Sequence, residues 1–269
     1  MVNFFKSLGA FATRLYRCRA IIWAMAKQDL AQRYAGTAGG ILWAFVHPAL
    51  MVLIYWFVFS IGFKAQAPGH MPFVLYFVSG LVPWLLFSEV LLTSMTAVTA
   101  NAALIKKTVF PSEILPLAHF LSASFTHLVF IALLCALCLL YGYGPRLTLL
   151  QIGYYYIALG CLSLGLSWMV GSIHVFHRDL AQAVSALLNL WFWVTPVVWP
   201  AEMIPRDLSF ILKFNPVYYI VDGYRSVITG IPFWTRLSEG VMFWAVTAPV
   251  LLAGAYVFKR LKPEFAEVL

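Results

Sequence analysis

Residues 73–100 read FVLYFVSGLVPWLLFSEVLLTSMTAVTA, and this stretch decides the fold class of the chain. It exceeds the about 20 predominantly apolar residues that an α-helix needs to cross a bilayer. Glu89 is its single charged residue. Because a charge is costly in hydrocarbon, Glu89 is expected to face protein or water. Two interpretations remain open: a pathway-lining carboxylate or proton relay, and a carboxyl bonded to a neighbouring helix.

The composition of the whole chain also indicates a membrane protein. Of its 269 residues, 62% are apolar and only 10% are charged, whereas soluble domains carry about 25% charged residues. Six segments predict transmembrane helices: residues 39–63, 73–100, 114–142, 147–176, 180–200 and 237–258. The polar stretch IHVFHRDL separates the fourth segment from the fifth. We therefore predict an all-α membrane protein with six transmembrane helices.

The basic residues predict the orientation. One side of the membrane would hold Lys6, Arg14, Arg17, Arg19, Lys27, Arg33, Lys106, Lys107, Arg178, Lys259, Arg260 and Lys262. Because cytoplasmic loops carry the excess of Lys and Arg, both termini are predicted to be cytoplasmic. The net charge of +8 then reflects the flanks of the spans rather than a nucleic-acid partner. The chain is predicted to be one membrane domain, 1–269, with a cytoplasmic interface segment 1–36, a six-span region 37–258 and a cytoplasmic tail 259–269.

Two regions outside the spans are also apolar. Residues 3–19 place six apolar residues at helical spacing, which predicts an amphipathic helix in the cytoplasmic interface or an ordinary surface helix. Residues 201–236, on the outside, are too apolar for a simple loop but are interrupted by charges and a proline. This pattern predicts short re-entrant helices buried against protein, or an external cap. Within that region, Asp222 and Arg225 are spaced to pair on one helix face.

The predicted cytoplasmic loop LIKKTVFPSEILP, residues 104–116, is more than a connector. Its two prolines limit any helix to one or two turns. Lys106 and Lys107 are explained by anchoring on the inner side. Phe110, followed directly by Pro111, is not explained in this way. A stiff segment with one exposed aromatic side chain is typical of docking into a groove on a partner.

Motifs for catalysis, nucleotide binding and metal binding are missing from the sequence. No glycine is followed by lysine, so the chain has no phosphate-binding loop. His119 and His127, eight residues apart on one span, make a poor metal pair, and His174 and His177 lack an evident third ligand. The four cysteines are too few for a disulfide framework, and Cys135 and Cys138 are interpreted as small packing residues of one helix face rather than a redox pair. We predict no catalytic residue, no metal site and no cofactor in this chain; ATP and Mg²⁺ would bind a separate subunit.

Aromatic residues cluster on the predicted outer half of the chain. Among them are Tyr154, Tyr155, Trp191, Trp193, Trp199, Tyr218, Tyr219, Tyr224 and Trp234. Tyr and Trp at this level commonly form an interfacial belt. The alternative is that some of them face a pathway, where flat rings suit the faces of sugars and polar edges donate hydrogen bonds.

Four stretches together resemble one transporter family. They are QDLAQRYAGTAGGILWAFVHPALMVLIYWFVF (28–59), SGLVPWLLFSE (79–89), LIKKTVFPSEILP (104–116) and HVFHRDLAQAV…WFWVTPVVWP (174–200). In their order and spacing the chain resembles the ABC-2-type permeases that export lipid-linked polysaccharides, the O-antigen, capsule and teichoic-acid exporters of the Wzm/KpsM/TagG kind. The resemblance covers nearly the whole chain.

The resemblance implies a homodimer with two copies of a cytoplasmic ATP-binding subunit, in the bacterial inner membrane. It implies an ATPase-coupling set of Ile105, Lys106, Lys107, Val109, Phe110, Pro111, Glu113, Arg178 and Asp179. It implies an N-terminal interface or gate set of Asp29, Arg33 and Tyr34. Candidates for the channel or outer gate are Trp43, Glu89, Tyr154, Tyr155, Trp191, Trp193, Tyr218, Tyr219 and Tyr224. ATP-driven closure would then open a channel for a sugar polymer on a lipid anchor.

Three other functions remain as alternatives to polysaccharide export. An ABC-2 exporter of a drug or simple lipid would share the fold and differ in its substrate. An intramembrane enzyme would use Glu89 with His119 or His127. A membrane scaffold would use none of these residues. Dependence of ATP turnover on the polymer separates the first alternative, and the effect of replacing Glu89 by Gln separates the second.

Overall fold

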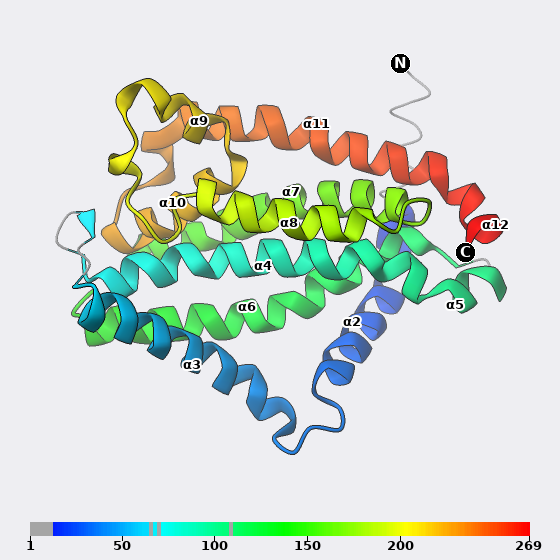
Figure 1. Ribbon diagram of the computed structural model, residues 1–269, viewed down its shortest axis with the longest axis horizontal. Helices are drawn as coiled ribbons and strands as arrows, with labels where there is room; N and C mark the ends of the chain where they lie inside the picture. Colours follow the sequence, from blue (N-terminus) through cyan, green and yellow to red (C-terminus); the bar gives the residue numbers. More distant parts are fainter. Residues whose placement is uncertain (1–12, 65–66, 69–70, 108–109) are drawn as a thin grey trace.

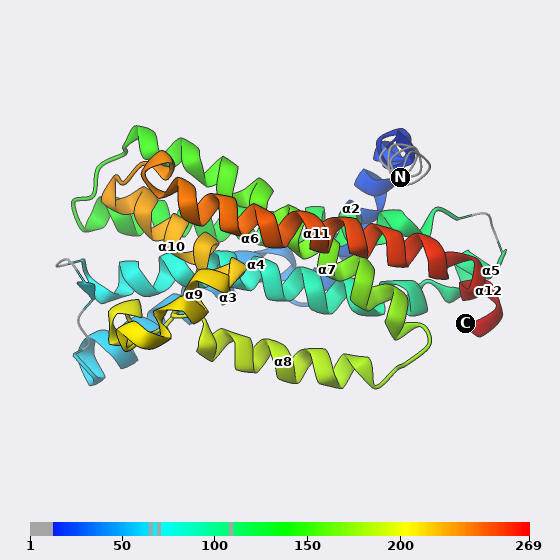
Figure 2. The ribbon, with the colours of Figure 1, turned by 90° about the horizontal axis from the view of Figure 1, so that it is seen from above.

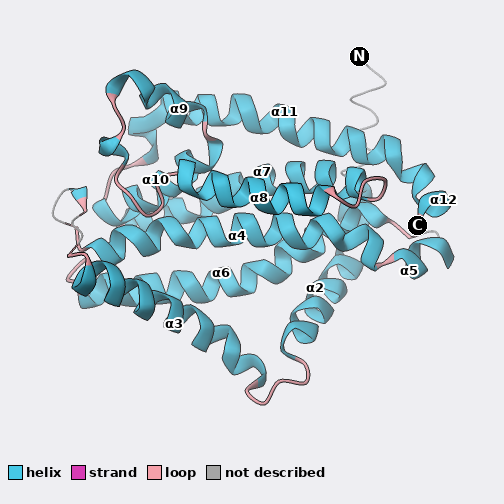
Figure 3. Ribbon diagram, viewed as in Figure 1, coloured by secondary structure: helices cyan, strands magenta, loops and turns pink. Residues whose placement is uncertain are grey.

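The computed structural model describes residues 13–64, 67–68, 71–107 and 110–269. Within these ranges the regular structure is helical, and no strand is found (Figure 3). The all-α prediction is confirmed for this part of the chain. Residues 13–17 of the expected interface helix are helical. Residues 3–12 lie outside the described ranges, so the interface helix as a whole stays a prediction.

Five helical segments of the described chain are long and apolar enough to cross a membrane. They are Gly40–Gly62, with η1 (Gly40–Leu42), α3 (Trp43–Trp56) and η2 (Phe57–Gly62); α4 (Phe73–Ala100); Ser112–Leu140, with η4 (Ser112–Ile114) and α6 (Leu115–Leu140); Leu147–His174, with η5 (Leu147–Leu150) and α7 (Gln151–His174); and Phe233–Val268, with η8 (Phe233–Arg236), α11 (Leu237–Leu261), η9 (Lys262–Glu264) and α12 (Phe265–Val268). These segments correspond to the first four predicted spans and the last one.

The fifth predicted span, residues 180–200, is shorter in the structure than its apolar run suggests. Its helix α8 covers Leu180–Val194, which is 15 residues. At 1.5 Å per residue this helix is about 22 Å long, less than the about 30 Å of hydrocarbon in a bilayer. The helix ends because Thr195, which precedes Pro196, adopts an extended backbone. The count of six spans therefore stays a prediction.

The long helices run along one axis of the molecule and give it two distinct ends (Figure 1). At one end lie α5 (Ala102–Lys107), α12 and the C-terminus; we call this the α5 end. At the other lie α9 (Ser209–Phe214) and α10 (Pro216–Thr229), with the short turns η6 (Ala201–Met203) and η7 (Arg206–Leu208); we call this the α10 end. Seen from above, α8 lies along one edge of the bundle (Figure 2).

Helices α2 (Arg19–Tyr34) and α3 form a V on one side of the bundle (Figure 1). Gly36 and Gly40 at its apex have positive φ angles of 76° and 49°, a conformation that glycine adopts without steric cost. Helix α2 packs on α6, and α3 packs on α4 and α6. Much of α3 carries exposed apolar side chains, among them Trp43, Phe45, Leu50, Leu53 and Trp56. This face is available to lipid or to another protein surface.

Helix α4 is the centre of the bundle and is buried along most of its length. It packs against α6, α7, α8 and α10. Beside it, α7 and α11 approach each other unusually closely at Gly165 and Gly254. A Cβ atom built on Gly254 would lie 2.0 Å from the carbonyl oxygen of Gly165. Small residues at such a crossing let two helix backbones touch, as is common in membrane proteins.

Candidate functional site

The predicted docking stretch begins with α5 at one end of the bundle. Lys106 and Lys107 are exposed there, and Ile105 is half-buried and packs against the apolar cluster at the α5 end. Val109 lies outside the described residues. Helix α5 contacts α4 and α12, so the two lysines project from a supported turn rather than from a free loop. Lys106 and Lys107 therefore form an exposed basic surface at this end of the bundle.

The expectation of an exposed Phe110 is wrong. Phe110 is half-buried and packs against two neighbouring apolar clusters, which contain Leu115 and Phe258 in one case and Ile22 and Ile114 in the other. Pro111 beside it is also half-buried. The ring therefore fixes the stretch to the bundle in this conformation. Hydropathy could not show this, because part of the apolar surface that covers Phe110, including Ile22 and Phe258, comes from distant parts of the sequence.

Glu113 does not face outward with the lysines of α5. Its side chain is only 3% exposed. One carboxylate oxygen lies 3.4 Å from Nη1 of Arg14, and the other accepts a hydrogen bond from Nζ of Lys262. The indole Nε1 of Trp168 donates to the Glu113 carbonyl oxygen at 2.9 Å. Glu113 is thus an internal junction of the α5 end and offers no surface to a partner.

Arg178 and Asp179 are exposed in the turn between α7 and α8. This turn lies toward the α5 end in Figure 1. The structure therefore brings four exposed charged residues of the predicted coupling set, Lys106, Lys107, Arg178 and Asp179, to one end of the bundle. Both elements are short and lie between long helices, so a partner bound there would contact α4, α7 and α8 indirectly through them.

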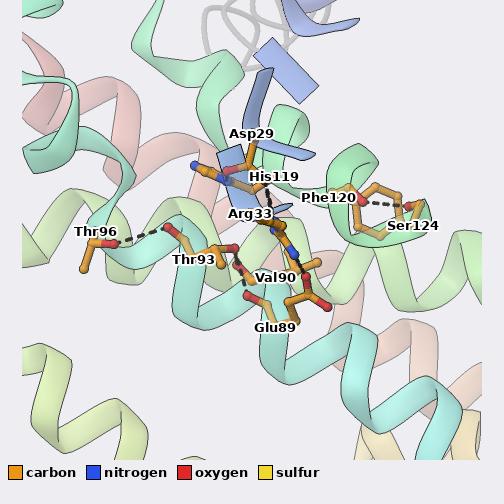
Figure 4. A network of polar contacts seen from close by, with 9 residues as sticks. All are labelled: Asp29, Arg33, Glu89, Val90, Thr93, Thr96, His119, Phe120 and Ser124. Carbon is orange, nitrogen blue, oxygen red and sulfur yellow. Dashed lines mark hydrogen bonds and ion pairs between the residues drawn. The ribbon is translucent and has the colours of Figure 1, made fainter. Parts of the chain in front are cut away.

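Helix α2 is joined to the bundle by a charged cluster (Figure 4). Arg33 binds Asp29 on its own helix, with Nε–Oδ2 and Nη2–Oδ2 distances of 3.0 and 2.9 Å, and forms an ion pair with Glu89 on α4. Nδ1 of His119 on α6 lies 3.2 Å from Oδ1 of Asp29. Glu89 therefore follows the second interpretation of its sequence context, a carboxyl bonded to a neighbouring helix. The cluster joins α2, α4 and α6.

The pKa of Asp29 lies well below its usual range. Burial by itself would raise this pKa, but the hydrogen bond and charge of His119 and the charge of Arg33 outweigh it. Asp29 is therefore a carboxylate at neutral pH, which the ion pair with Arg33 requires. Tyr34, the last residue of α2, lines an open groove of about 340 Å³ together with Arg33, Trp43 and His47.

The tyrosines proposed for a channel lie mostly inside the chain. Tyr155 and Tyr224 are 0% and 1% exposed, so the rest of the chain covers their side chains almost completely. Tyr224 is hydrogen-bonded to Nε2 of His127 at 2.9 Å. Tyr219 is also buried, and its hydroxyl lies 3.2 Å from that of Tyr154. These side chains join α10 to α6 and α7, a role that periodicity does not reveal.

The other aromatic candidates are more accessible. Trp193 and Trp43 are exposed, on α8 and at the start of α3. Trp191 on α8 is half-buried and Tyr218 on α10 is half-buried. Tyr218 also borders an open groove of about 660 Å³ at the α10 end, together with Glu202, Lys213 and Glu239. This groove combines aromatic faces with polar edges, a composition that suits a hydrated polar ligand.

Asn215 joins the broken end of α8 to α10. Its Oδ1 caps α10 by accepting from the backbone N–H groups of Val217 and Tyr218, and accepts from Nε1 of Trp191 at 3.0 Å. Its Nδ2 donates to Oγ1 of Thr195 at 2.9 Å. Asn215 is not among the residues predicted from the sequence, although an asparagine directly before a proline is a clear signal for a helix start.

Asp222 and Arg225 do not pair with each other, so the prediction from their spacing is wrong. Asp222 pairs with Arg236 at 2.7 Å. Arg225 is buried, with its guanidinium 3.6 Å above the ring of Tyr76, and donates to the carbonyl oxygens of Tyr76 and Val197. The end of α8 leaves the Val197 carbonyl without a helical partner, and Arg225 satisfies it.

No metal-binding group is present in the described part of the chain, since no three His, Cys, Asp or Glu side chains come together there. Cys135, Cys138 and Cys161 are free and half-buried on α6 and α7. At the α5 end, Glu113 is ion-paired with Arg14 and Lys262. The geometry of the described residues thus indicates mechanical junctions between helices more than a site for chemistry.

Comparison with known proteins identifies the family. Residues 21–229 match the family described as ABC-2 type transporter, which covers more than half of the chain. The chain belongs to the ABC-2 type transporter family. It is 31% identical to an O-antigen export system permease protein, RfbA, of Klebsiella pneumoniae over 93% of this chain and 95% of that protein. It is 29% identical to the O-antigen export system permease protein RfbA of Myxococcus xanthus, over 94% of this chain and 96% of that protein. It is 23% identical to the polysialic acid transport protein KpsM of Escherichia coli, over 87% of this chain and 92% of that protein.

Proposed function

We propose that this chain is the transmembrane subunit of an ATP-driven transporter that exports a lipid-linked polysaccharide across the bacterial inner membrane. The observation that carries the proposal is the likeness to the O-antigen export permeases of two organisms over nearly the full length of both proteins. The chain itself is a multi-pass membrane protein with several apolar spans. A polysaccharide cannot cross about 30 Å of hydrocarbon unaided, so such a substrate requires a protein pathway.

The proposed assembly is a homodimer with two copies of a separate ATP-binding subunit. The exposed apolar face of α3 supports a partner within the membrane, and a second copy of the chain is the partner proposed. The exposed Lys106 and Lys107 of α5, with Arg178 and Asp179, form the proposed docking surface for the ATP-binding subunit. The α5 end then faces the cytoplasm with both termini, and the chain crosses the membrane six times, with α8 as the fifth crossing.

The proposed pathway uses the accessible aromatic residues rather than the buried ones. Trp43, Trp191, Trp193 and Tyr218 are the candidates that a polymer could contact in the dimer. The buried Tyr155 and Tyr224 hold α10 in place, and α9 and α10 act as re-entrant helices at the outer mouth. Glu89 is assigned to the junction with Arg33, since that ion pair accounts for its charge.

Two measurements test this proposal together. The first is copurification of the ATP-binding subunit encoded for the same transporter, comparing wild type with Lys107→Glu. The second is display of the polymer on the cell surface. Lys107→Glu is expected to lower both, because it reverses a charge on the proposed docking surface. Lys64→Glu, the same reversal at an exposed residue near the α10 end, is the matched control and should change neither.

The outcomes separate the proposal from its alternative. If wild type brings down no ATP-binding subunit, the transporter assignment is wrong. If it does, but ATP hydrolysis by the reconstituted complex responds to a hydrophobic drug or a simple lipid and not to the lipid-linked polymer, the chain is an ABC-2 exporter of small amphiphiles. Stimulation by the polymer alone supports the polysaccharide exporter.

A further inference from the structure

Three distant parts of the chain meet at the carboxylate and carbonyl of Glu113. Arg14 comes from the N-terminal segment, Lys262 follows α11, and Trp168 lies on α7. Glu113 itself sits in η4, between α5 and α6. The residue therefore connects the loop that carries the proposed docking surface to three other elements at one point. Charged residues that only flank a membrane span need to face water and do not need to join several helices in this way.

The burial of Glu113 makes this connection firm. Its side chain is 3% exposed, whereas those of Lys262 and Arg14 are 28% and 62% exposed. A buried carboxylate is stabilised only while its cationic partners stay in place. The surrounding apolar cluster, with Leu115, Phe258 and Phe265, excludes water on the other sides. Movement of the loop away from Lys262 would leave the carboxylate without its nearest charge, so the two segments are expected to move together.

Apolar contacts link the same elements. Phe265 of α12 packs on Phe258 of α11 with ring centroids 5.4 Å apart, and on Phe176 after α7 at 6.2 Å. Helix α12 also contacts α5. Lys262 lies between Phe258 and Phe265 in the sequence, so its ion pair with Glu113 fastens a tail that is already packed against the bundle.

We infer that Glu113 is a positioning residue that transmits displacement of α5 to α7, α11 and the N-terminal segment through its bonds to Trp168, Lys262 and Arg14. The inference rests on the proposed function, because it needs a partner that moves α5. Within that function, Glu113 lies inside the chain behind the docking surface and does not contact the partner. It contributes to the conversion of partner movement into helix movement and not to the binding of the partner.

The test compares variants of both partners of the ion pair in the complete complex. Glu113→Gln removes the charge at the buried site, and Glu264→Gln removes the same charge at an exposed position of η9. Lys262→Gln removes the cation, Lys262→Arg keeps it, and Arg260→Gln is the matched control on α11. For each we would measure membrane insertion, copurification of the ATP-binding subunit, ATP hydrolysis, and polymer translocated per ATP hydrolysed in proteoliposomes.

The expected result is a specific loss of coupling. Glu113→Gln and Lys262→Gln should retain the ATP-binding subunit but translocate about five-fold less polymer per ATP, the lower end of typical coupling between sites. Lys262→Arg should restore the ratio, and the two control variants should leave it at the wild-type value. A structural role alone would lower insertion and assembly together with transport and would leave the ratio unchanged.

Two outcomes would overturn the inference. In the first, the polymer translocated per ATP is unchanged in Lys262→Gln and Glu113→Gln. In the second, the ratio falls equally in Lys262→Arg, which shows that charge at this position is irrelevant. Failure of wild type itself to copurify with the ATP-binding subunit is a different result, since it overturns the proposed function before any variant is compared.

Discussion

The two ends of the bundle are held together by different kinds of contact. At the α5 end and along α2, charged side chains from distant segments pair: Glu113 with Arg14 and Lys262, and Arg33 with Glu89. At the α10 end, the Asp222–Arg236 ion pair is outnumbered by hydroxyl, amide and aromatic contacts around Asn215 and the tyrosines of α7 and α10. Ion pairs tolerate small changes of geometry, whereas tightly packed rings do not. The difference indicates that the helices at the α5 end can shift slightly without losing their contacts, whereas the packing at the α10 end allows less movement.

At the α10 end, the largest effect is expected at Gly223 on α10, where a helix backbone lies against a buried ring. A Cβ atom there would lie 2.3 Å from a ring carbon of Tyr155, which is fully buried and has no room to move. Gly223→Ala should therefore destabilise the protein by about 3 kcal/mol, the upper part of the range for overpacking. Thermal unfolding in detergent measures this.

Gly153→Ala on α7 is the matched control for that substitution. Nothing lies within 4 Å of its added Cβ atom, and alanine is about 1 kcal/mol more favourable than glycine in a helix. This variant should be as stable as wild type or more stable. Equal stability of the Gly223→Ala and Gly153→Ala variants would show that the α10 end is loosely packed.

A somewhat smaller effect is expected at Asn215. Replacement by alanine removes the cap of α10 and leaves the Trp191 N–H and the Thr195 hydroxyl unpaired. Loss of a cap and of these bonds should cost about 2 kcal/mol of unfolding free energy. Asn215→Asp keeps both acceptor roles and loses only the donor to Thr195, so it should cost less. If the two variants lose equal stability, the cap and the Trp191 bond contribute nothing.

The third prediction concerns pH and distinguishes the two types of contact directly. The pKa of Asp29 is lowered in the folded chain, so its contribution is fully present above its unfolded pKa, about 4, and is lost as the pH falls further toward the folded value. Hydrogen-exchange protection of α2, measured relative to that of α10, should fall on acidification below about pH 4. In Asp29→Asn this relative loss of protection should disappear. An equal change of protection in α2 and α10 of wild type would contradict the assignment.

The smallest effect on stability is expected on the surface of α5. Lys106→Gln and Lys107→Gln change exposed side chains that form no hydrogen bond or ion pair within the described residues, so the melting temperature should stay within the error of the measurement. Binding of the proposed ATP-binding subunit should weaken in the same variants. A fall in melting temperature without weaker binding would assign these lysines to folding instead of docking.

The sequence predicted the long spans well because each is a continuous apolar run that needs no partner to be recognised. It did not predict where α8 ends, although Thr195–Pro196 lies within the run and marks the break. The apolar character of residues 195–200 concealed a change of backbone that depends on local geometry rather than hydropathy.

The polar contacts were harder to predict than the helices. For Asp222 and Arg225, the local rule for helix neighbours failed because each has a different partner from another part of the chain, Arg236 for one and two carbonyl oxygens for the other. Arg33 and Glu89 are 56 residues apart, and Glu113 and Lys262 are 149 apart. No periodicity in a single sequence connects such positions. The residue types of the candidate site could therefore be predicted from the sequence, but the pairs that they form could not.

The contact between Gly165 and Gly254 restricts how α7 and α11 can move. Where one backbone touches another, neither helix can rotate or slide past the other without collision of main-chain atoms. We therefore expect the two helices to move together as one rigid unit, with this crossing as their point of contact. A force applied to Lys262 at the end of α11 would swing α7 as well, and spectroscopic labels on the two helices would keep a constant separation while both change their distance from α6.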